Sequence, residues 1–497
     1  MSTEPVEPLL DMDQVKVDPA WALRVPASLA VRRQLLPFAL VQGQVCVACS
    51  NQRDASAIQA LQRQLQQPLK LYNAEPASLK RALDRIYGNA EAAARMGAAA
   101  AGKPRTGDVE SEDAVSLCDE LLSAALVRQA SDVHLNPKAD KLQVRFRVDG
   151  VLEDYRPLPI ALHASMVSRF KVLSGMDISE RRSPQDGRFT HTFGGQNQKV
   201  DVRVATLPTR HGERMTLRLL AVQTESLTLE KLGMSDADLK NFSHAIDRPH
   251  GLILITGPTG SGKTTSLYAA IRKLIAGATY NVITIEDPIE YEISDVQQVE
   301  VDSADKVSFA KALRSVLRHD PDVVMIGEIR DHETADIAIK SSLTGHLVMS
   351  TLHTNSAVSA VTRLVDMEID RFLIAATLRL AVAQRLVRRL CQHCHRSRPL
   401  THAEAETLSR PAAGTAVFDP VGCMYCANRG YVGRLGVFEM LPVDERIAGM
   451  ISSGAEETAL IAQLRLQQQP QLVDDGLMKM QSGLTSAAEV LASVASW

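Results

Sequence analysis

Residues Gly257–Thr265 read G-P-T-G-S-G-K-T-T and directly follow the apolar run Leu252–Thr256. The apolar run predicts a buried parallel strand, and the residues from Thr265 to Ile271 have helical composition. A strand, a glycine loop and a helix in this order are the context in which G-x-x-x-x-G-K-[ST] forms a phosphate-binding loop. The stretch therefore predicts an open α/β domain that binds a nucleoside triphosphate.

Each position of this loop has an expected role. The glycines let the backbone wrap closely around phosphate, with N–H groups and a helix N-terminus facing the negative charge. Lys263 is expected to contact the β- and γ-phosphates, and Thr264 to place its hydroxyl on Mg²⁺. We expect the following residues to bind ATP: Gly257, Pro258, Thr259, Gly260, Ser261, Gly262, Lys263, Thr264 and Thr265.

The composition indicates a globular, multidomain protein. The chain has 497 residues, 45% of them hydrophobic, and its 55 basic and 58 acidic residues give a net charge of −3. This balance does not favour a dedicated nucleic-acid binder. No apolar run reaches the ~18 residues of a membrane span, and the N-terminus lacks the basic start of a signal peptide. We therefore expect seven reduced or metal-bound cysteines, a cytoplasmic location, and membrane contact only through partners.

The pattern of apolar and turn residues predicts six segments. Alternating strands and helices point to an α/β core, preceded by an α+β module with a helix from about Glu112 to Ala130. An alanine-rich stretch is the linker candidate, although its alanines could also continue a helix. The expected segments are an N-terminal domain (1–88), a linker (89–111), an α+β domain (112–225), a phosphate-loop domain (226–390), a cysteine element (391–432) and a helical tail (433–497).

Three further segments complete the expected active site. Asn281–Glu290 (N-V-I-T-I-E-D-P-I-E) and Asp322–Arg330 (D-V-V-M-I-G-E-I-R) are strands that end in carboxylates, at Glu286 and Glu328. Ligands of open α/β sheets bind at such carboxyl ends, where a carboxylate can orient water or hold Mg²⁺ through water. Thr344–Asn355 (T-G-H-L-V-M-S-T-L-H-T-N) is a strand flanked by His346 and His353.

In this order, the four motifs resemble the secretion-ATPase superfamily, the motors of type II secretion and type IV pilus assembly. The resemblance covers residues 112–440 strongly, and the first 90 residues are similar, more weakly, to the family's docking domain. It implies a RecA-like ATPase core, a PAS-like α+β domain before it, and a homo-hexamer. It further implies that the N-terminal domain docks on an inner-membrane platform protein, so that the motor is peripheral to the cytoplasmic face of that membrane.

The resemblance also implies roles for single residues. Glu328 takes the place of the family's Walker B glutamate, Glu286 falls in its Asp box, and His346 and His353 fall in its His box. Family members use arginines of the preceding module to contact the phosphates. Arg203 and Arg218 match that stretch, and we expect them to stabilise charge in the transition state.

Two C-x-x-C pairs, Cys391/Cys394 and Cys423/Cys426, predict a tetrahedral structural Zn²⁺ site. A pair of disulfides is the alternative, which a reducing compartment disfavours. Arginines around the pairs could offset the negative charge of the thiolates or contact acidic lipid. A third C-x-x-C, Cys46/Cys49, lies in a strand and predicts buried thiols, because residues i and i+3 of a strand point to opposite faces.

The sequence thus predicts an ATP-hydrolysing motor of type II secretion. The type IV pilus extension motor shares every motif and stays open as an alternative. A nucleic-acid motor would require a basic stripe, which the near-neutral charge disfavours. A nucleotide-binding scaffold without catalysis would not need both Lys263 and Glu328.

Overall fold

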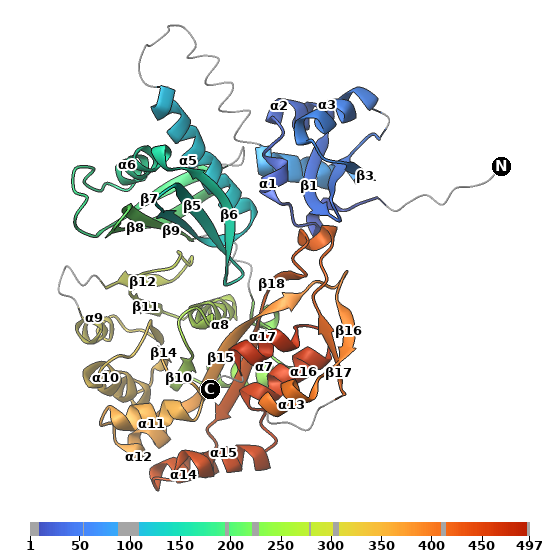
Figure 1. Ribbon diagram of the computed structural model, residues 1–497. Helices are drawn as coiled ribbons and strands as arrows, with labels where there is room; N and C mark the ends of the chain where they lie inside the picture. Colours follow the sequence, from blue (N-terminus) through green and yellow to red (C-terminus); the bar gives the residue numbers. More distant parts are fainter. Residues whose placement is uncertain are drawn as a thin grey trace. The chain divides into compact units, whose positions relative to one another are not determined.

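The structure is a computed structural model that describes residues 9–52, 54–87, 109–193, 198–220, 228–277, 280–301, 308–408 and 414–494. The chain divides into two compact units (Figure 1). The first comprises Met1–Val222, Cys391–His395 and Pro420–Val432, and the second comprises Gln223–Leu390, Arg396–Asp419 and Gly433–Trp497. Residues 89–108 of the expected linker lie outside the described residues, and the remainder of it already belongs to a helix.

The N-terminal part of the first unit is a small sheet covered by helices. Strands β1 (Leu35–Val41) and β2 (Gln44–Cys49) pair antiparallel, and β3 (Leu69–Asn73) pairs parallel to β2 after the crossover helix α3 (Ala55–Leu65). The short helices here are η1 (Met12–Gln14), α1 (Pro19–Ala22), α2 (Ala27–Arg33) and a further helix over 76–87. Cys46 and Cys49 are buried free thiols, as the sequence predicted.

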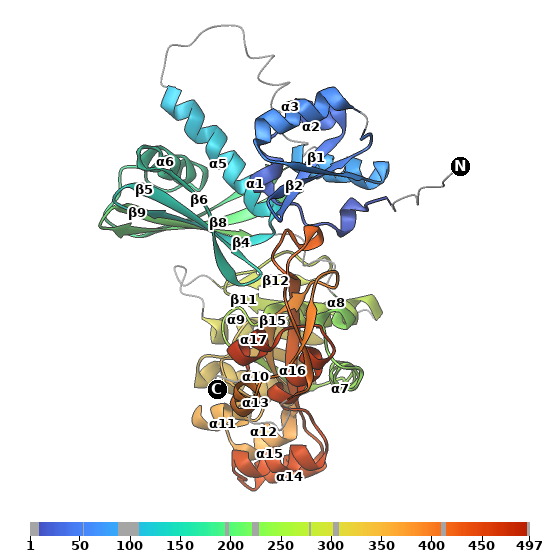
Figure 2. The same ribbon diagram turned by 45° about the vertical axis from the view of Figure 1, so that its right-hand side comes forward.

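The second part of the first unit is a six-stranded antiparallel sheet with helices on one face (Figure 2). Its strand order is β6-β5-β4-β9-β8-β7. The bounds are α5 (Val109–Val127), β4 (Ala130–Pro137), β5 (Lys141–Val148), β6 (Val151–Pro159), η2 (Ile160–Leu162), α6 (His163–Leu173), β7 (Gln185–Phe193), β8 (Gln198–Thr209) and β9 (Gly212–Leu220). Buried residues of α5 and α6 share one core with alternate residues of the strands. The strands β6 and β7 were not predicted, because their apolar residues do not alternate regularly.

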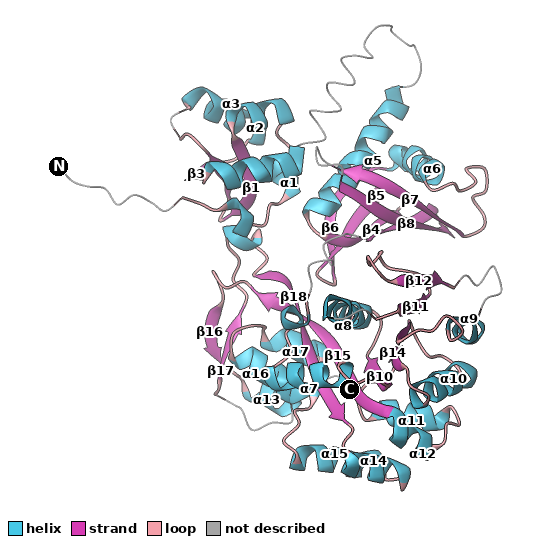
Figure 3. Ribbon diagram, turned by 180° about the vertical axis from the view of Figure 1, so that it is seen from behind, coloured by secondary structure: helices cyan, strands magenta, loops and turns pink. Residues whose placement is uncertain are grey.

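The second unit contains a seven-stranded sheet of order β12-β11-β13-β14-β10-β15-β18, with helices on both faces (Figure 3). Its strands are β10 (Gly251–Thr256), β11 (Val282–Glu286), β12 (Gln297–Glu300), β13 (Val323–Ile326), β14 (Leu347–Leu352), β15 (Leu378–Leu390) and β18 (Tyr431–Pro442). Leu252 and Leu254 of β10 belong to one core, and Ile253 and Ile255 belong to the other. Burial on both faces explains why this strand is a continuous apolar run.

The helices of the second unit are amphipathic or buried elements that cover this sheet and extend to the C-terminus. They are η4 (Leu229–Leu232), α7 (Asp236–Ile246), α8 (Lys263–Gly277), α9 (Phe309–Val316), α10 (His332–Leu343), α11 (Ser359–Asp366), α12 (Arg371–Thr377), α13 (His402–Thr407), α14 (Glu445–Ser452), α15 (Glu457–Leu466), α16 (Leu472–Gln481) and α17 (Ala487–Ser493). In the described part of the chain, no helix is long and apolar enough to cross a membrane.

The expected cysteine element, residues 391–432, is divided between the units. Cys391–His395 and Pro420–Val432 group with the first unit and contain the short helix η5 (Met424–Cys426). The residues between them form the hairpin β16 (Arg396–Pro399) and β17 (Ala416–Asp419) with α13, all in the second unit. The cysteine pairs and the segment that separates them are thus parts of different units.

Candidate active site and metal centre

The phosphate loop joins the carboxyl end of β10 to the first residue of α8. Two glycines of this loop have no room for a side chain. Gly257 has φ +147°, and a Cβ there would lie 2.5 Å from the Gln384 carbonyl oxygen. At Gly262, with φ +86°, a Cβ would lie 2.9 Å from Gln384 Nε2. Gln384 of β15 also accepts a hydrogen bond from Ser266 of α8 at 2.8 Å, so the neighbouring strand fixes the shape of the loop.

Lys263 lies over this loop. Its Nζ donates to the carbonyl oxygens of Gly257 at 2.7 Å and Pro258 at 3.1 Å. Burial lowers the pKa of Lys263, and the negative charge of Glu328 partly offsets this effect. The structure therefore brings Lys263 and Glu328 into one electrostatic environment, although 65 positions separate them in sequence.

Glu328 follows β13 and lies between two cationic or titratable side chains. Arg330 donates to its Oε1, and His353 Nε2 lies 3.2 Å from its Oε2. Burial raises the pKa of Glu328, but the hydrogen bonds and charges of Arg330 and His353 outweigh burial and hold it below its ordinary value. Its side chain keeps 16% exposure, so water or a ligand can reach the carboxylate.

Hydroxyl groups tie the strand ends of this edge together. Thr256, the last residue of β10, receives the Thr354 N–H at 2.7 Å and donates to the Thr354 carbonyl oxygen at 2.8 Å. Thr351 of β14 donates to the Gly327 carbonyl oxygen at 2.7 Å. These bonds connect the phosphate loop, the Glu328 segment and the His353 segment into one edge of the sheet.

His346 lies at the other end of the sheet. The parallel register pairs Gly251 with Leu347 and Thr256 with Leu352, so His346 precedes the amino end of β14. Its Nδ1 contacts the Ser341 carbonyl oxygen at 3.0 Å. Six strand residues at a rise of ~3.3 Å separate it from the loop by about 20 Å. The structure brings His353 to the site but not His346, and we assign His346 no phosphate contact within its own chain.

Glu286, the last residue of β11, is only 2% exposed. Its carboxylate accepts hydrogen bonds from the Tyr268 hydroxyl, from Thr284 Oγ1 at 2.6 Å and from Gln298 Nε2 at 3.0 Å. Burial raises the pKa of Glu286, and the three donors oppose that rise. Tyr268 is on α8, so Glu286 connects the helix of the phosphate loop to β11 and β12 instead of facing an open edge.

Arg385 is a residue that the sequence reasoning missed as part of the loop. It is 4% exposed in β15 and donates to the carbonyl oxygens of Gln384 at 3.1 Å and Asn355 at 3.0 Å. Burial lowers its pKa, partly offset by Glu439. A Cβ at Gly257 would lie 3.2 Å from its guanidinium, so Arg385 packs closely against the phosphate loop. The only signal was a charged residue inside an apolar strand.

Two other arginines near the cysteine pairs have partners in the second unit. Arg388 donates to Glu489 at 2.7 Å, and Arg398 forms ion pairs with Glu404 at 2.6 Å and Asp419 at 2.7 Å. These contacts, and the burial of Arg385, favour structural roles for these three arginines.

Arg203 and Arg218 lie in the first unit, side by side on β8 and β9. The register extends this row to Arg188 on β7 and, through Asp132 on β4, to Arg147 on β5. Directly paired residues point to the same face, and the neighbours of the arginines along each strand are core residues. The row therefore lies on the face turned away from α5 and α6. Arg218, 61% exposed, donates to Asp132 at 3.0 Å.

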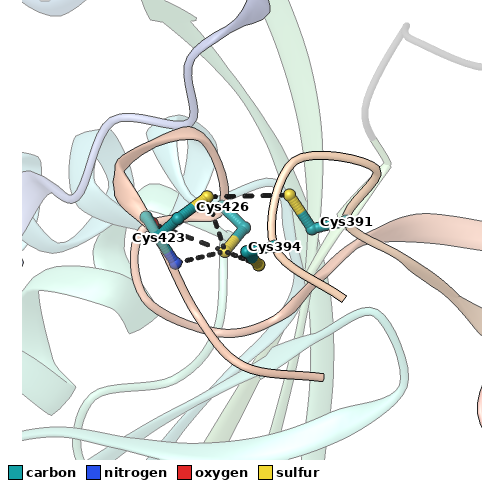
Figure 4. Close-up of side chains that lie close together, drawn as sticks. All are labelled: Cys391, Cys394, Cys423 and Cys426. Atoms are coloured by element: carbon teal, nitrogen blue, oxygen red, sulfur yellow. Dashed lines mark hydrogen bonds between the residues drawn. The ribbon is translucent and has the colours of Figure 1, made fainter. Parts of the chain in front are cut away.

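The four predicted metal ligands converge within the first unit (Figure 4). One sulfur atom from each of Cys391, Cys394, Cys423 and Cys426 lies within 4.8 Å of the others. Backbone N–H groups also donate to these sulfur atoms: Gly422 to Cys394 at 3.3 Å, and Cys423 and Gly430 to Cys426 at 3.2 and 3.1 Å. Such donors stabilise thiolates, so the cluster fits a metal ion that prefers sulfur ligands.

Comparison with known families agrees with this geometry. The sequence model of the family described as "Type II/IV secretion system protein" matches residues 108–492, and that of the MshEN domain matches residues 7–93. The chain belongs to the type II/IV secretion system protein family. The family predicted from the four motifs is confirmed, and with it the mixed α/β fold of a secretion ATPase.

Curated relatives of this secretion ATPase share much of its length. The type II secretion system protein E of Klebsiella pneumoniae is 43% identical over 487 residues, which cover 93% of this chain and 97% of the relative. The protein E of Pseudomonas aeruginosa is 42% identical over 484 residues, covering 94% and 95%. The type II secretion system ATPase E of Vibrio cholerae is 46% identical over 387 residues, covering 77% and 76%.

Two solved structures share the fold of this secretion ATPase. The ATPase DotB of Legionella pneumophila has a TM-score of 0.58 at 23% identity, covering 78% of this chain and 96% of that protein. The pilus retraction motor PilT with bound ADP has a TM-score of 0.52 at 28% identity, covering 75% and 95%.

Proposed function

We propose that the chain is the ATP-hydrolysing motor of a type II secretion system. The observation that carries the proposal is the edge of the parallel sheet in the second unit. There the phosphate loop, Lys263 and a Glu328 of lowered pKa occur together in a chain 43% identical to a type II secretion protein E. The core of the second unit is RecA-like in this proposal, and the six-stranded module of the first unit is PAS-like.

The residues at the edge divide the chemistry between them. The loop from Gly257 to Thr265 binds the triphosphate through its backbone N–H groups, and Lys263 binds the β- and γ-phosphates. Glu328 orients the attacking water and accepts its proton, and His353 holds the Glu328 carboxylate in place. Thr264 offers a hydroxyl oxygen, a suitable ligand for Mg²⁺, and the cation neutralises charge on the phosphates when bound.

The arginine row adds positive charge from the first unit. Arg203 and Arg218 stabilise the charge that develops on the transferred phosphoryl group, and Arg188 extends the same row. In this proposal, which follows the family, these arginines reach the phosphates only in one stage of the cycle, so that hydrolysis is linked to movement.

The cysteine cluster holds Zn²⁺ in this proposal, through Cys391, Cys394, Cys423 and Cys426. The metal is structural, because four protein ligands leave no open position.

The assembly follows the family. Six chains form the motor, which acts in the cytoplasm on the inner face of the inner membrane. The MshEN-like N-terminal domain docks on a platform protein of the secretion system, and no nucleic acid is required. The type IV pilus extension motor is the second candidate, since every catalytic element would serve it equally.

Three measurements test the proposal. Lys263→Ala should abolish ATP hydrolysis, and turnover that persists would show that the loop is not the site.

Metal analysis should return about one zinc per chain. A pull-down with the full chain should recover a type II secretion platform protein, whereas recovery of a pilus platform protein would favour the second candidate.

A further inference from the structure

The loop that carries Cys423 and Cys426 contacts the N-terminal part of the chain. The carbonyl oxygen of Tyr425 accepts the Lys16 N–H at 3.0 Å. The side chains of Met424 and Tyr425 pack against the core that contains Met12, Val15 and Phe38. Helix η5, a single turn that follows Cys423 and ends at Cys426, contacts β1. A backbone bond and two apolar side chains thus attach this loop to residues 9–87.

Both cysteine pairs shape this attachment. The ring of Tyr425 stacks on His393, between Cys391 and Cys394, with centroids 3.9 Å apart and an interplanar angle of 16°. Ala427 and Asn428 adopt φ +50° and +62°. Residues other than glycine and asparagine seldom take such values. The N–H donors to Cys426 on both sides of this turn hold it closed around the sulfur atom.

Metal occupancy controls the shape of this loop on physical grounds. Four thiolates within 4.8 Å of one another repel unless a cation neutralises them, and four thiols make only weak hydrogen bonds. A metal ion held by the four cysteines would restrain both loops and the position of η5, which begins after Cys423 and ends at Cys426. Loss of the ion frees the turn to relax, and the apolar contact of Met424 and Tyr425 depends on that turn.

We propose that the metal-loaded tetracysteine loop is the docking site, inside the chain, for the N-terminal domain (residues 9–87). The inference rests on the metal assignment under Proposed function and adds a partner to that site. Cys391 directly follows β15, the strand that pairs with β10 beside the phosphate loop. The backbone therefore runs directly from the strand beside the phosphate loop into the first cysteine pair of the docking site.

A second contact provides the competing explanation. Arg128, which follows α5, forms an ion pair with Asp18 at 2.6 Å, and both side chains are largely buried. If this ion pair alone placed the N-terminal domain, the Lys16 N–H would stay protected without metal. The Arg429–Glu153 pair at 3.6 Å connects the loop to β6 and does not touch the N-terminal domain.

Hydrogen exchange of the full-length protein tests the proposal, with metal content measured on the same samples. Removing the metal with a chelator should accelerate exchange of the Lys16 amide about tenfold or more, and adding Zn²⁺ back should restore protection. The double variant Met424→Ala/Tyr425→Ala should keep about one metal per chain yet show the same acceleration. Tyr425→Phe, which keeps the ring and the carbonyl, should behave like the parent protein.

Exchange of β2 amides (Gln44–Cys49) reports whether the N-terminal domain stays folded in every sample. Unchanged Lys16 protection after metal removal, with faster exchange at Cys423–Gly430, would overturn the proposal and favour the Asp18–Arg128 pair. Wild-type protection in the double variant would overturn it as well. A chain that binds no metal would refute both this inference and the zinc assignment, while the ATPase proposal would stand.

Discussion

Two glutamates at the ends of neighbouring parallel strands show how different two similar motif positions can be. Glu286 ends β11 and Glu328 follows β13, and the two strands pair directly. Glu286 is buried among three neutral donors, and burial raises its pKa. Glu328 is partly exposed between Arg330 and His353, and its pKa is lowered. A strand end delivers a carboxylate to an edge, but the side chains around it decide whether that carboxylate faces solvent or the interior.

The comparison assigns different roles to the two residues. We propose that Glu328 performs the chemistry, because its pKa is lowered, water can reach it and its charge acts on Lys263. For Glu286 we propose a positioning role, since its partner Tyr268 is on the helix that begins with Lys263. The expectation that both glutamates are catalytic thus becomes a proposal with one chemical and one supporting residue.

The largest effect should come from Glu328→Gln. The amide cannot accept a proton, so ATP hydrolysis should fall about 1,000-fold while ATP binding persists. Steady-state turnover and nucleotide-binding measurements on the assembled protein check this. Glu333→Gln, which alters an exposed partner of Arg314 on α10, is the control and should leave turnover unchanged. Normal turnover in Glu328→Gln would remove the catalytic assignment.

The next largest effect on turnover should come from Arg203, a charge that the first unit contributes. Arg203→Ala should reduce kcat about 100-fold, because it removes charge stabilisation of the transition state. Arg145→Ala, on the same sheet but ion-paired with Asp154 at 2.8 Å, is the matched control and should have little effect. If both variants hydrolysed ATP equally well, the arginine row would be a surface feature only.

Substitution of Glu286 should act mainly on stability. Glu286→Ala leaves three buried donors without an acceptor and should lower the free energy of unfolding of its unit by about 3 kcal/mol. Glu286→Gln keeps the size of the side chain and an acceptor oxygen, so it should lose less. Denaturant titration measures the free energy of unfolding of both variants, when it is followed by a spectroscopic signal that reports unfolding of the second unit. A 1,000-fold loss of kcat in Glu286→Gln with unchanged stability would reverse the roles of the two glutamates.

The smallest effect should be on the pH dependence of stability, which has opposite signs for Glu328 and Glu286. Glu328 has a lowered pKa, so its contribution to stability is present above its unfolded pKa and is lost as pH falls through the folded one. Glu286 has a raised pKa, so its contribution is present at low pH and is lost as pH rises through the folded value. Melting temperatures across acidic to neutral pH should therefore show the advantage of the parent protein over Glu328→Gln shrinking on acidification. Its advantage over Glu286→Gln should grow, and parallel curves would contradict both shifts.

The sequence alone predicted the phosphate loop, the buried strands around it and the four cysteines that converge in the structure. Each of these depends on short-range pattern: glycines that permit φ > 0, apolar runs that are buried on both faces, and cysteines spaced to hold one ion. The same local logic predicted buried free thiols at Cys46 and Cys49, and the structure confirms them.

Only the tertiary structure decided which of these groups meet. The parallel register separated His346 from the loop and kept His353 beside Glu328, because a strand's two ends lie on opposite edges of the sheet. Antiparallel pairing added Arg188 to the row, and Arg385 became a support for Gly257 through strand order. The docking of Tyr425 on the N-terminal part joins Lys16 and Tyr425, which are 409 positions apart. No local pattern encodes such contacts, since they arise when distant segments bury their apolar surfaces together.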